Sequence, residues 1–446
     1  MTIRACDGKG RTTRSSTVVN VADEPRLLAE PRGGVPEVIT TLDDFRRMIL
    51  RFAMADGSVA ADAERASGFR YGHEDWLVQF KREGAGIALV DPVVLAEQGA
   101  NWADFNLAVG DSAWIIHDSL QDLPGFADLG MRPKALFDTE MAARLLGLSR
   151  FGLAAVTEHY LGLTLAKEHS AADWSYRPLP RDWRNYAALD VELLIELEDR
   201  MGAELRRQGK DGWAREEFSY LLAKGMEPKE RPVQPWRHIS HINALARDQR
   251  GLAVARGLWT RRDEIARHYD IAPSLLLPDA AIIEAAQRKP RNAREFRAIR
   301  SLNERVRVHT GGEQDKMFER YAPIQREVKP VVWKDAIAEA LALRAADLPV
   351  SPPSGNDEGN APRSMRYWQD HHPARYARLQ AARKVINQIA DDTRTPADVI
   401  VKPQLIRNLC WTDDIRSRDV AEFLHGQGAR RWQVDLIAAS VTRAIM

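Results

Sequence analysis

Hydrophobic and polar positions first take on a regular pattern near residue 40. The stretch TLDDFRRMILRFA has apolar residues at helical spacing, and Thr41 stands where an N-cap hydroxyl is favoured, so a helix is predicted here. Short apolar runs bounded by turn residues follow, and each predicts a strand. These runs are SVAADAE (58–64), WLVQF (76–80), GIALVDP (86–92) and AWIIHDS (113–119).

Helical periodicity takes over after the fourth strand. A short helix is predicted from about Gln121 to Leu129, and three longer stretches share the 3.6-residue period. They are TEMAARLLG, LAAVTEHYLG and RDWRNYAALDVELLIELEDRMGAELRRQ. Strands followed by alternating strands and helices indicate an α/β layer fold with a mixed sheet and flanking helices.

Turn-rich segments divide the chain into five parts. Proline, glycine, serine and charged residues interrupt the periodic pattern near residues 31–36, 226–236 and 348–364, and these interruptions predict boundaries. We predict a flexible tail over 1–35, an α/β domain over 36–225, a linker over 226–236, an all-helical domain over 237–326 and a second helical domain over 327–446. Within the last part, residues 348–364 are predicted to be disordered.

Composition narrows the class of protein. The chain has 446 residues, of which 44% are hydrophobic and 28% charged, as is usual for a globular protein with a sizeable core. No apolar run approaches the ~18 residues of a membrane span, and the polar, basic N-terminus lacks a signal-peptide core. Two cysteines exclude a disulfide scaffold and a zinc ribbon. We therefore expect a cytoplasmic protein without membrane contact. A monomer is the expected oligomeric state, although the sequence does not reveal it.

The net charge of +1 hides an asymmetry between two parts of the chain. Residues 36–225 carry 31 acidic and 21 basic residues, a net charge of −10. Residues 236–330 carry 12 acidic and 19 basic residues, a net charge of +7. A basic part beside an acidic part favours a polyanionic partner, although charged runs also occur simply as solvated surfaces.

Five residues on different predicted elements form the candidate chemical site. Asp62 and Glu64 stand at positions i and i+2 of the first strand, so their side chains share a face. Asp122 lies in the first turn of a helix that follows a strand, where an acid is also explained by the helix dipole. Tyr186 and Asp190 share a helix face at i and i+4, where the tyrosine would fit equally well in a core.

Each of these residues has an ordinary explanation, but the ordered set predicts chemistry. Carboxylates that converge on one point cannot all remain ionised without cations. Two divalent ions would neutralise them and hold a phosphodiester, and hard oxygen ligands favour Mg²⁺ or Mn²⁺ over Zn²⁺. A tyrosine hydroxyl could then orient the attacking water.

These segments resemble bacterial ribonuclease D, a family of DEDD-type 3′→5′ exonucleases with a ribonuclease H-like fold. AADAERASGFRY, IIHDSLQDLPGF and NYAALDVELL are similar to its three exonuclease motifs. The resemblance implies that Asp62, Glu64, Asp122 and Asp190 are metal ligands and that Tyr186 orients the water. Asn185 stands where the other subtype has histidine, and Ala63 replaces the threonine frequent in the family.

The basic segment resembles the helicase and ribonuclease D C-terminal (HRDC) domain, and the last part of the chain is similar to a second module of this kind. Arginines at such a place are expected to contact phosphates without reading sequence, although they would equally suit a helix with many salt bridges. The candidate RNA-binding residues are Arg247, Arg250, Arg256, Arg261 and Arg262, together with Trp174 and Arg177 in a loop of the α/β domain.

The resemblance implies a metal-dependent 3′→5′ exoribonuclease that trims RNA with a single-stranded 3′ end, such as tRNA precursors. Two alternatives remain open. The same acids would serve a DNA 3′→5′ exonuclease, because contacts to the 2′-hydroxyl cannot be read from the sequence. A non-catalytic RNA-binding protein on the same fold is the other, although the presence of all five candidate residues argues against it.

Overall fold

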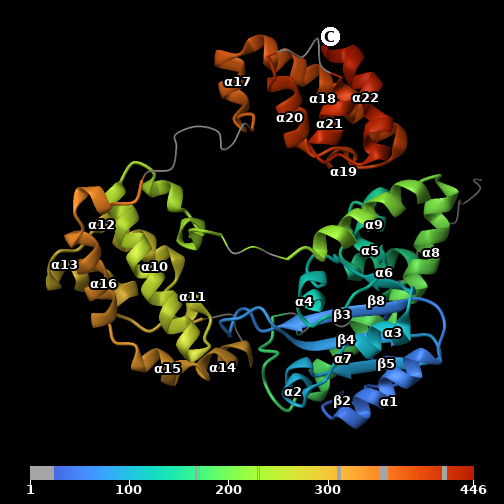
Figure 1. The fold of residues 1–446 in the computed structure, drawn as a ribbon, viewed down its shortest axis with the longest axis horizontal. Coiled ribbons are helices and arrows are strands. Elements are labelled where there is room, and N and C mark those ends of the chain that lie inside the picture. Colours follow the sequence, from blue (N-terminus) through green and yellow to red (C-terminus); the bar gives the residue numbers. More distant parts are fainter. Residues whose placement is uncertain are drawn as a thin grey trace, which may run out of the picture.

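The computed structural model describes residues 25–165, 169, 171–228, 230, 232–308, 313–350, 360–413 and 419–446. These residues form three bodies (Figure 1). We call them the α/β domain, from β1 to α9; the middle domain, from η1 (Pro235–His238) to η4 (Ala345–Asp347); and the C-terminal domain, from α17 (Met365–His371) to α22 (Arg431–Ile445). No helix in the described ranges is long and apolar enough to cross a membrane.

A six-stranded mixed sheet forms the centre of the α/β domain, with the order β2-β5-β4-β3-β6-β7. The strands are β2 (Val38–Ile39), β3 (Val59–Arg65), β4 (Asp75–Arg82), β5 (Gly86–Val90), β6 (Ala113–Ile116) and β7 (Ala135–Asp138). β4 runs antiparallel to both β3 and β5, whereas the other neighbours are parallel. The mixed sheet with flanking helices is the fold class that the sequence predicts.

Helices cover both faces of this sheet (Figure 1). α1 (Leu42–Ala53) begins at Thr41, whose hydroxyl accepts a hydrogen bond from the Asp44 amide, as the sequence predicts. The remaining helices are α2 (Pro92–Glu97), α3 (Ala103–Val109), α4 (Leu123–Asp128), α5 (Thr139–Leu145), α6 (Leu153–Leu161), α7 (Arg181–Glu192), α8 (Leu194–Arg207) and α9 (Asp211–Gly225). α7 packs against β3, β4 and β5 and brings its face over the middle of the sheet.

Two expectations for this domain are wrong. The single helix predicted over residues 181–208 is broken at Leu193, where α7 gives way to α8. α7 buries Trp183 and Ala187 in one core cluster, whereas α8 buries Leu197 and Met201 in another. Part of the predicted flexible tail is ordered: β1 (Arg26–Leu28) pairs in parallel with β8 (Leu163–Leu165). Residues 1–24 lie outside the described part of the chain.

The middle domain is built around the 21-residue helix α10 (Gln249–Tyr269). Its other elements are η2 (Ile242–Leu245), α11 (Pro273–Leu276), α12 (Asp279–Arg288), α13 (Ala293–Arg297), η3 (Arg300–Leu302), α14 (Glu313–Glu319), α15 (Ala322–Glu327) and α16 (Val331–Ala342). The apolar positions predicted for α10, among them Leu252 and Leu258, lie in its core.

The predicted boundary at residues 326–327 does not match this packing. α16 lies beyond it, yet Trp333 and Ile337 are buried in the core of the middle domain. Gly257 of α10 allows this approach, because a Cβ there would lie 3.2 Å from the Ala336 carbonyl oxygen. None of the turn-rich interruptions falls at residues 326–327, and the apolar face of α16 places this helix in the middle domain.

The C-terminal domain is a separate helical body with its own core. Besides α17 and α22 it contains α18 (Pro373–Thr393), α19 (Ala397–Ile400), α20 (Pro403–Trp411) and α21 (Val420–Gly426). Residues 348–364, for which disorder is predicted, separate these helices from α16 along the chain. Residues 351–359 of that segment lie outside the described ranges.

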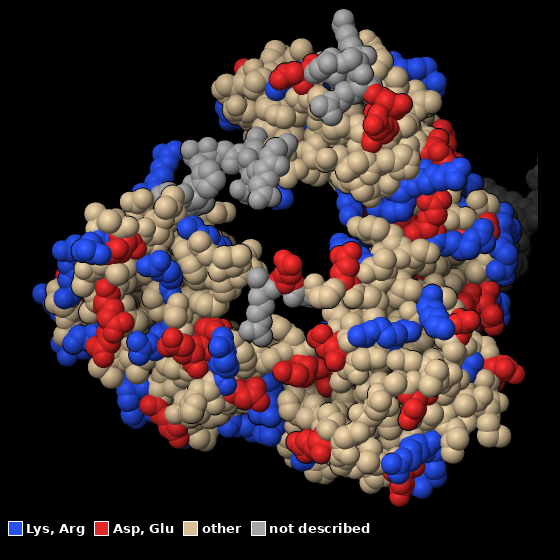
Figure 2. All heavy atoms as spheres, viewed as in Figure 1, with Lys and Arg blue, Asp and Glu red and all other residues tan. Residues whose placement is uncertain are grey.

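Both helical domains contact the α/β domain. In the C-terminal domain, the Trp432 ring stacks on Trp213 of α9 with a centroid distance of 4.7 Å. In the middle domain, Phe318 stacks on Phe69 of the α/β domain with a centroid distance of 4.4 Å. An opening lies between the three bodies (Figure 2).

Candidate active site

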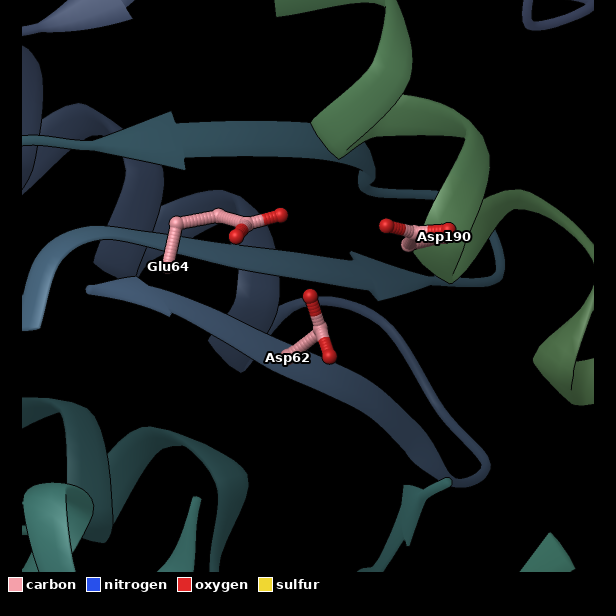
Figure 3. Close-up of side chains that lie close together, drawn as sticks. All are labelled: Asp62, Glu64 and Asp190. Atoms are coloured by element: carbon pink, nitrogen blue, oxygen red, sulfur yellow. The ribbon is translucent and has the colours of Figure 1, made fainter. Parts of the chain in front are cut away.

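Three carboxyl groups meet where β3 passes beneath α7. Asp62 and Glu64 project from the same face of β3, and Asp190 projects toward them from α7 (Figure 3). One oxygen from each side chain lies within 4.8 Å of the others. The alternation of β3 and the contact of α7 with β3 thus bring together three of the four acids selected in the sequence.

The surroundings of these acids disfavour their charged forms. Glu64 is only 9% exposed. Asp62 and Asp190 keep partial access to solvent but are densely surrounded by protein. Loss of hydration and the neighbouring carboxylates raise the pKa values of Asp62 and Glu64 well above their usual range. Loss of hydration likewise raises the pKa of Asp190 to about 7, although the bond from Tyr186 opposes this shift.

Tyr186 lies one turn before Asp190 on the same helix, and its hydroxyl counteracts the rise in the pKa of that carboxyl group. Burial, followed by the charges of Asp190 and Glu64, raises the pKa of the Tyr186 hydroxyl above its usual value. The hydroxyl therefore stays protonated at neutral pH and is available as a hydrogen-bond donor.

Asp122, the fourth acid, is placed differently from the sequence expectation. It occupies the N-cap position of α4, but its side chain makes no capping bond. Instead Asp122 Oδ1 accepts a hydrogen bond of 2.8 Å from Arg65 Nη2. Burial and then the Asp62 charge raise the pKa of Asp122, and the two acids line the same cavity. Asp122 thus borders the three-carboxylate group but belongs to an ion pair.

Arg65 is a residue that the sequence reasoning missed. Its Nε donates to Asp75 Oδ1 at 2.9 Å, while its Nη2 binds Asp122, so one guanidinium bridges two nearly inaccessible carboxylates. An arginine directly after two strand acids was the available signal, because a cluster of carboxylates requires a nearby cation. Arg65 joins β3, β4 and the start of α4 at the edge of the site.

The acids open into a cavity of about 670 Å³, within the size range of ligand-binding pockets. Its lining includes Asp62, Glu64, Asp122, Asp190 and Tyr186, together with Arg65, His117, Glu140, Phe69 and Phe318. His117 is half-buried, and its Nδ1 is hydrogen-bonded to the Thr139 hydroxyl at 2.8 Å. All five candidate residues therefore face one space.

The donor set fits divalent metal ions. All the ligand candidates are carboxylate oxygens, the preferred partners of Mg²⁺ and Mn²⁺. The raised pKa values mean that the cluster is electrostatically unfavourable by itself when ionised, and a bound cation would relieve this repulsion.

Gly125 provides a test of how tightly the edge of this site is packed. A Cβ at Gly125 would lie 2.2 Å from Asp75 Oδ2, so Gly125→Ala must displace either α4 or the carboxylate that holds Arg65. We expect a loss of roughly 1–3 kcal/mol in the free energy of unfolding, measured with denaturant. Gly212→Ala is the control, because its Cβ would meet nothing closer than 4.0 Å. Equal stability of the two variants would contradict the close approach.

Two loop residues predicted to bind RNA are structural instead. Trp174 is 0% exposed and packs in a core with Leu77 and Trp183, so its ring cannot stack on a base. Arg177 forms an ion pair with the inaccessible carboxylate of Asp91 and donates to the carbonyl oxygen of Trp76 at 2.6 Å. The loop composition suggested a groove, but these side chains anchor the loop.

The arginines of α10 divide into different groups. Arg262 is 5% exposed and binds the Leu277 carbonyl and Asp279, so the prediction that it contacts RNA is wrong. Arg250 donates to the carbonyl oxygens of Leu341 and Leu343. Basic and acidic side chains are interspersed over this domain (Figure 2).

Three arginines of the set remain candidates. Arg261 is half-exposed and pairs with Glu264 and Glu339 at 3.6 and 3.7 Å. Arg256 is also half-exposed and lies 3.5 Å from the Asp347 carbonyl oxygen. Arg247 is exposed. Contact between these three and a nucleic acid stays a prediction.

Family models match three segments of the chain. Residues 36–206 match a model described as 3′-5′ exonuclease, residues 251–313 match the HRDC domain, and residues 361–445 match a 3′ to 5′ exonuclease C-terminal domain. The first match contains all five candidate residues.

Curated relatives include several proteins named ribonuclease D. The one from Shewanella sp. (strain ANA-3) is 30% identical over 230 residues, which is 51% of this chain and 58% of that protein. The one from Escherichia coli (strain K12) is 27% identical over 277 residues, covering 61% of this chain and 72% of that protein. This chain thus spans little more than half the length of the Shewanella relative.

Two solved structures are similar to this chain over most of its length. A crystal structure of a protein from Bifidobacterium adolescentis is 66% identical, with a TM-score of 0.89, and the match covers 95% of this chain and 100% of that one. The structure of Escherichia coli RNase D is 20% identical, with a TM-score of 0.59 over 92% of this chain and 98% of that one, and indicates a shared fold.

Proposed function

Because this chain is a homologue of ribonuclease D that combines a 3′-5′ exonuclease domain with an HRDC domain, we propose that it is a metal-dependent 3′→5′ exoribonuclease. The observation that carries the proposal is the convergence of Asp62, Glu64 and Asp190 within 4.8 Å in an open cavity. A structural role alone would not favour three mutually repelling carboxyl groups at the base of a pocket.

The proposed roles follow from the position of each side chain. Asp62, Glu64, Asp122 and Asp190 would hold two divalent ions, Mg²⁺ or Mn²⁺, which would supply activation of a water and stabilisation of the leaving oxygen. Arg65 keeps Asp122 at the edge of the cavity. The Tyr186 hydroxyl, neutral and directed to the same carboxylates, orients the attacking water by hydrogen bonding.

The proposed substrate is RNA with a single-stranded 3′ end, such as a tRNA precursor. Support comes from relatives named ribonuclease D and from the Escherichia coli neighbour, described as an exoribonuclease involved in structured RNA processing. The net charge of +7 over residues 236–330 would attract a polyanion toward the acidic domain. We propose that the protein acts as a cytoplasmic monomer.

A gel assay tests this function directly. The full chain is incubated with 5′-labelled RNA that has a single-stranded 3′ end, in Mg²⁺, in Mn²⁺ and in EDTA. A ladder that shortens from the 3′ end only with metal is expected. A matched DNA oligomer distinguishes the deoxyribonuclease alternative, since only RNA offers 2′-hydroxyl contacts. Binding without degradation in either metal would overturn the proposal in favour of a non-catalytic protein.

Tyr186→Phe separates the proposed water-orienting role from simple packing. The variant keeps the ring in place but removes the hydroxyl from the cavity that Tyr186 and Asp190 both line. We expect kcat to fall by about 10²-fold or more while KM changes little, because the hydroxyl acts on the reaction and not on RNA binding. Tyr160→Phe on α6 is the control and should keep full activity. An unchanged kcat in Tyr186→Phe would show that the tyrosine contributes only to packing.

A further inference from the structure

The segment between β3, which carries Asp62 and Glu64, and β4 reaches the core of the middle domain. Phe69, five residues after Glu64, is 3% exposed and belongs to the core of that domain. Its carbonyl oxygen accepts a 2.8 Å hydrogen bond from the Ala272 amide. Two residues later, Tyr71 donates from its hydroxyl to Asp263 at 3.0 Å. The segment after the proposed metal ligands is therefore fixed by contacts to the middle domain.

The middle domain contributes the aromatic ring of Phe318 to the cavity. Phe318 of α14 stacks on Phe69, with a centroid distance of 4.4 Å and an interplanar angle of 22°. Phe318 is only half-buried, and it lines the same cavity as Asp62, Glu64 and Tyr186. An apolar ring that only filled the domain interface would have no need to border a cavity lined by six carboxylates.

The position of Phe318 is held from the C-terminal side of α14. Tyr321 donates from its hydroxyl to Asp173 Oδ2 at 3.0 Å, and Arg320 pairs with the same carboxylate at 3.1 Å. Asp173 is 0% exposed, so removal of these partners would leave a buried charge without compensation. Two bonds to one buried acid thus fix the segment that presents Phe318.

We propose that Phe318 is a substrate-contacting residue of the exonuclease site. Its ring, backed by Phe69, forms the surface on which the 3′-terminal nucleobase stacks while the scissile phosphodiester lies at the carboxylates. This inference rests on the proposed function and adds to it a residue supplied by the middle domain. Stacking on an aromatic ring is available to every base, so the contact would select unpaired ends without selecting sequence.

The test compares Phe318→Leu with the wild type on two RNAs. One RNA ends in an ordinary nucleotide, and the other ends in an abasic nucleotide that has the same sugar and phosphate. Loss of base stacking is expected to lower kcat/KM roughly 5- to 100-fold. We expect the kcat/KM of the wild type to fall by this factor when the ordinary 3′ end is replaced by the abasic end. Phe318→Leu should show the same fall on the ordinary end. Phe318→Leu on the abasic end should show no additional fall, because the stacking contact has already been lost. Phe318→Trp should retain the preference for a base.

The controls separate this inference from folding and from the proposed function. Tyr367→Leu removes a half-exposed aromatic ring of the C-terminal domain and should behave as the wild type. Phe318→Met retains apolar volume if the leucine variant proves unstable. Equal fold losses on both RNAs would mean that Phe318 only supports the interface and would overturn the inference, although exonuclease activity would stand. Absence of metal-dependent trimming by the wild type would instead remove the function on which the inference rests.

Discussion

Asp190→Asn is expected to abolish exonuclease activity and, in the same protein, to raise the stability of the metal-free form at pH 8. The asparagine removes one charged oxygen ligand from the three that meet within 4.8 Å. Metal ions contribute several kcal/mol to such reactions, so we expect kcat to fall at least about 10³-fold. The gel assay in saturating Mg²⁺ measures this loss, and retention of full activity would show that Asp190 has no part in the reaction.

The gain in stability follows from the raised pKa of Asp190. The pKa of Asp190 in the folded state is about 7, above the usual value of 3.8. The protonated Asp190 therefore contributes its full share to the free energy of unfolding at pH values below 3.8. That contribution is lost as the pH rises through the folded-state pKa, because the surrounded carboxyl group must then ionise. Asparagine cannot ionise, so the melting temperature in EDTA should rise by roughly 2–8 °C at pH 8.

Two control measurements accompany this comparison. At pH 4 the wild type and Asp190→Asn should melt at similar temperatures, since the acid is then largely protonated. Mg²⁺ should raise the melting temperature of the wild type at pH 8 more than that of the variant, because binding to the folded state stabilises it. A variant that is less stable than the wild type at both pH values would show that Asp190 is held by favourable contacts.

Glu217→Leu is expected to release the C-terminal domain from the α/β domain. The Glu217 side chain on α9 is only 1% exposed and accepts hydrogen bonds from Arg430 Nε at 2.6 Å and Trp432 Nε1 at 2.8 Å. Without it, the partly buried Arg430 guanidinium and the buried Trp432 indole lose their acceptor, which costs about 3–5 kcal/mol. The expected result is a larger radius of gyration in solution scattering and faster proteolysis.

A second substitution on the same helix provides the control. Arg215 forms an exposed i,i+4 pair with Asp211, so Arg215→Ala should change stability by less than about 1 kcal/mol and leave the radius unchanged. Glu217→Leu with an unchanged radius would mean that the stacking of Trp213 on Trp432 is sufficient to hold the domain.

Local patterns were enough to predict the main elements and the acids. Period-two alternation placed Asp62 and Glu64 on one face of β3, and helical spacing placed Tyr186 beside Asp190. These relations depend on residues close in sequence, so one chain is sufficient to read them. The three-residue strand β1 had no such signal, because its partner β8 lies more than 130 residues away.

The predictions that were wrong concern side chains whose surroundings are formed by segments distant in the sequence. Trp174 and Arg262 belong to residue types that are frequent at RNA interfaces, yet both are buried by parts of the chain that composition does not reveal. The break at Leu193 has no glycine or proline to mark it. Phe318 was not recognised because its role depends on contact with Phe69, which no local pattern indicates.

Because Phe69 and Tyr71 contact the middle domain, the covalent linker is not the only connection between that domain and the α/β domain. Val233, in the segment between α9 and η1, is 98% exposed, so a protease can reach the backbone there. A single cut at this point should leave two fragments that co-elute under native conditions, because side chains on either side still bind each other. The order of the domains along the chain would then matter less than the contacts between them. A circularly permuted chain that begins and ends at this linker should therefore assemble the same site.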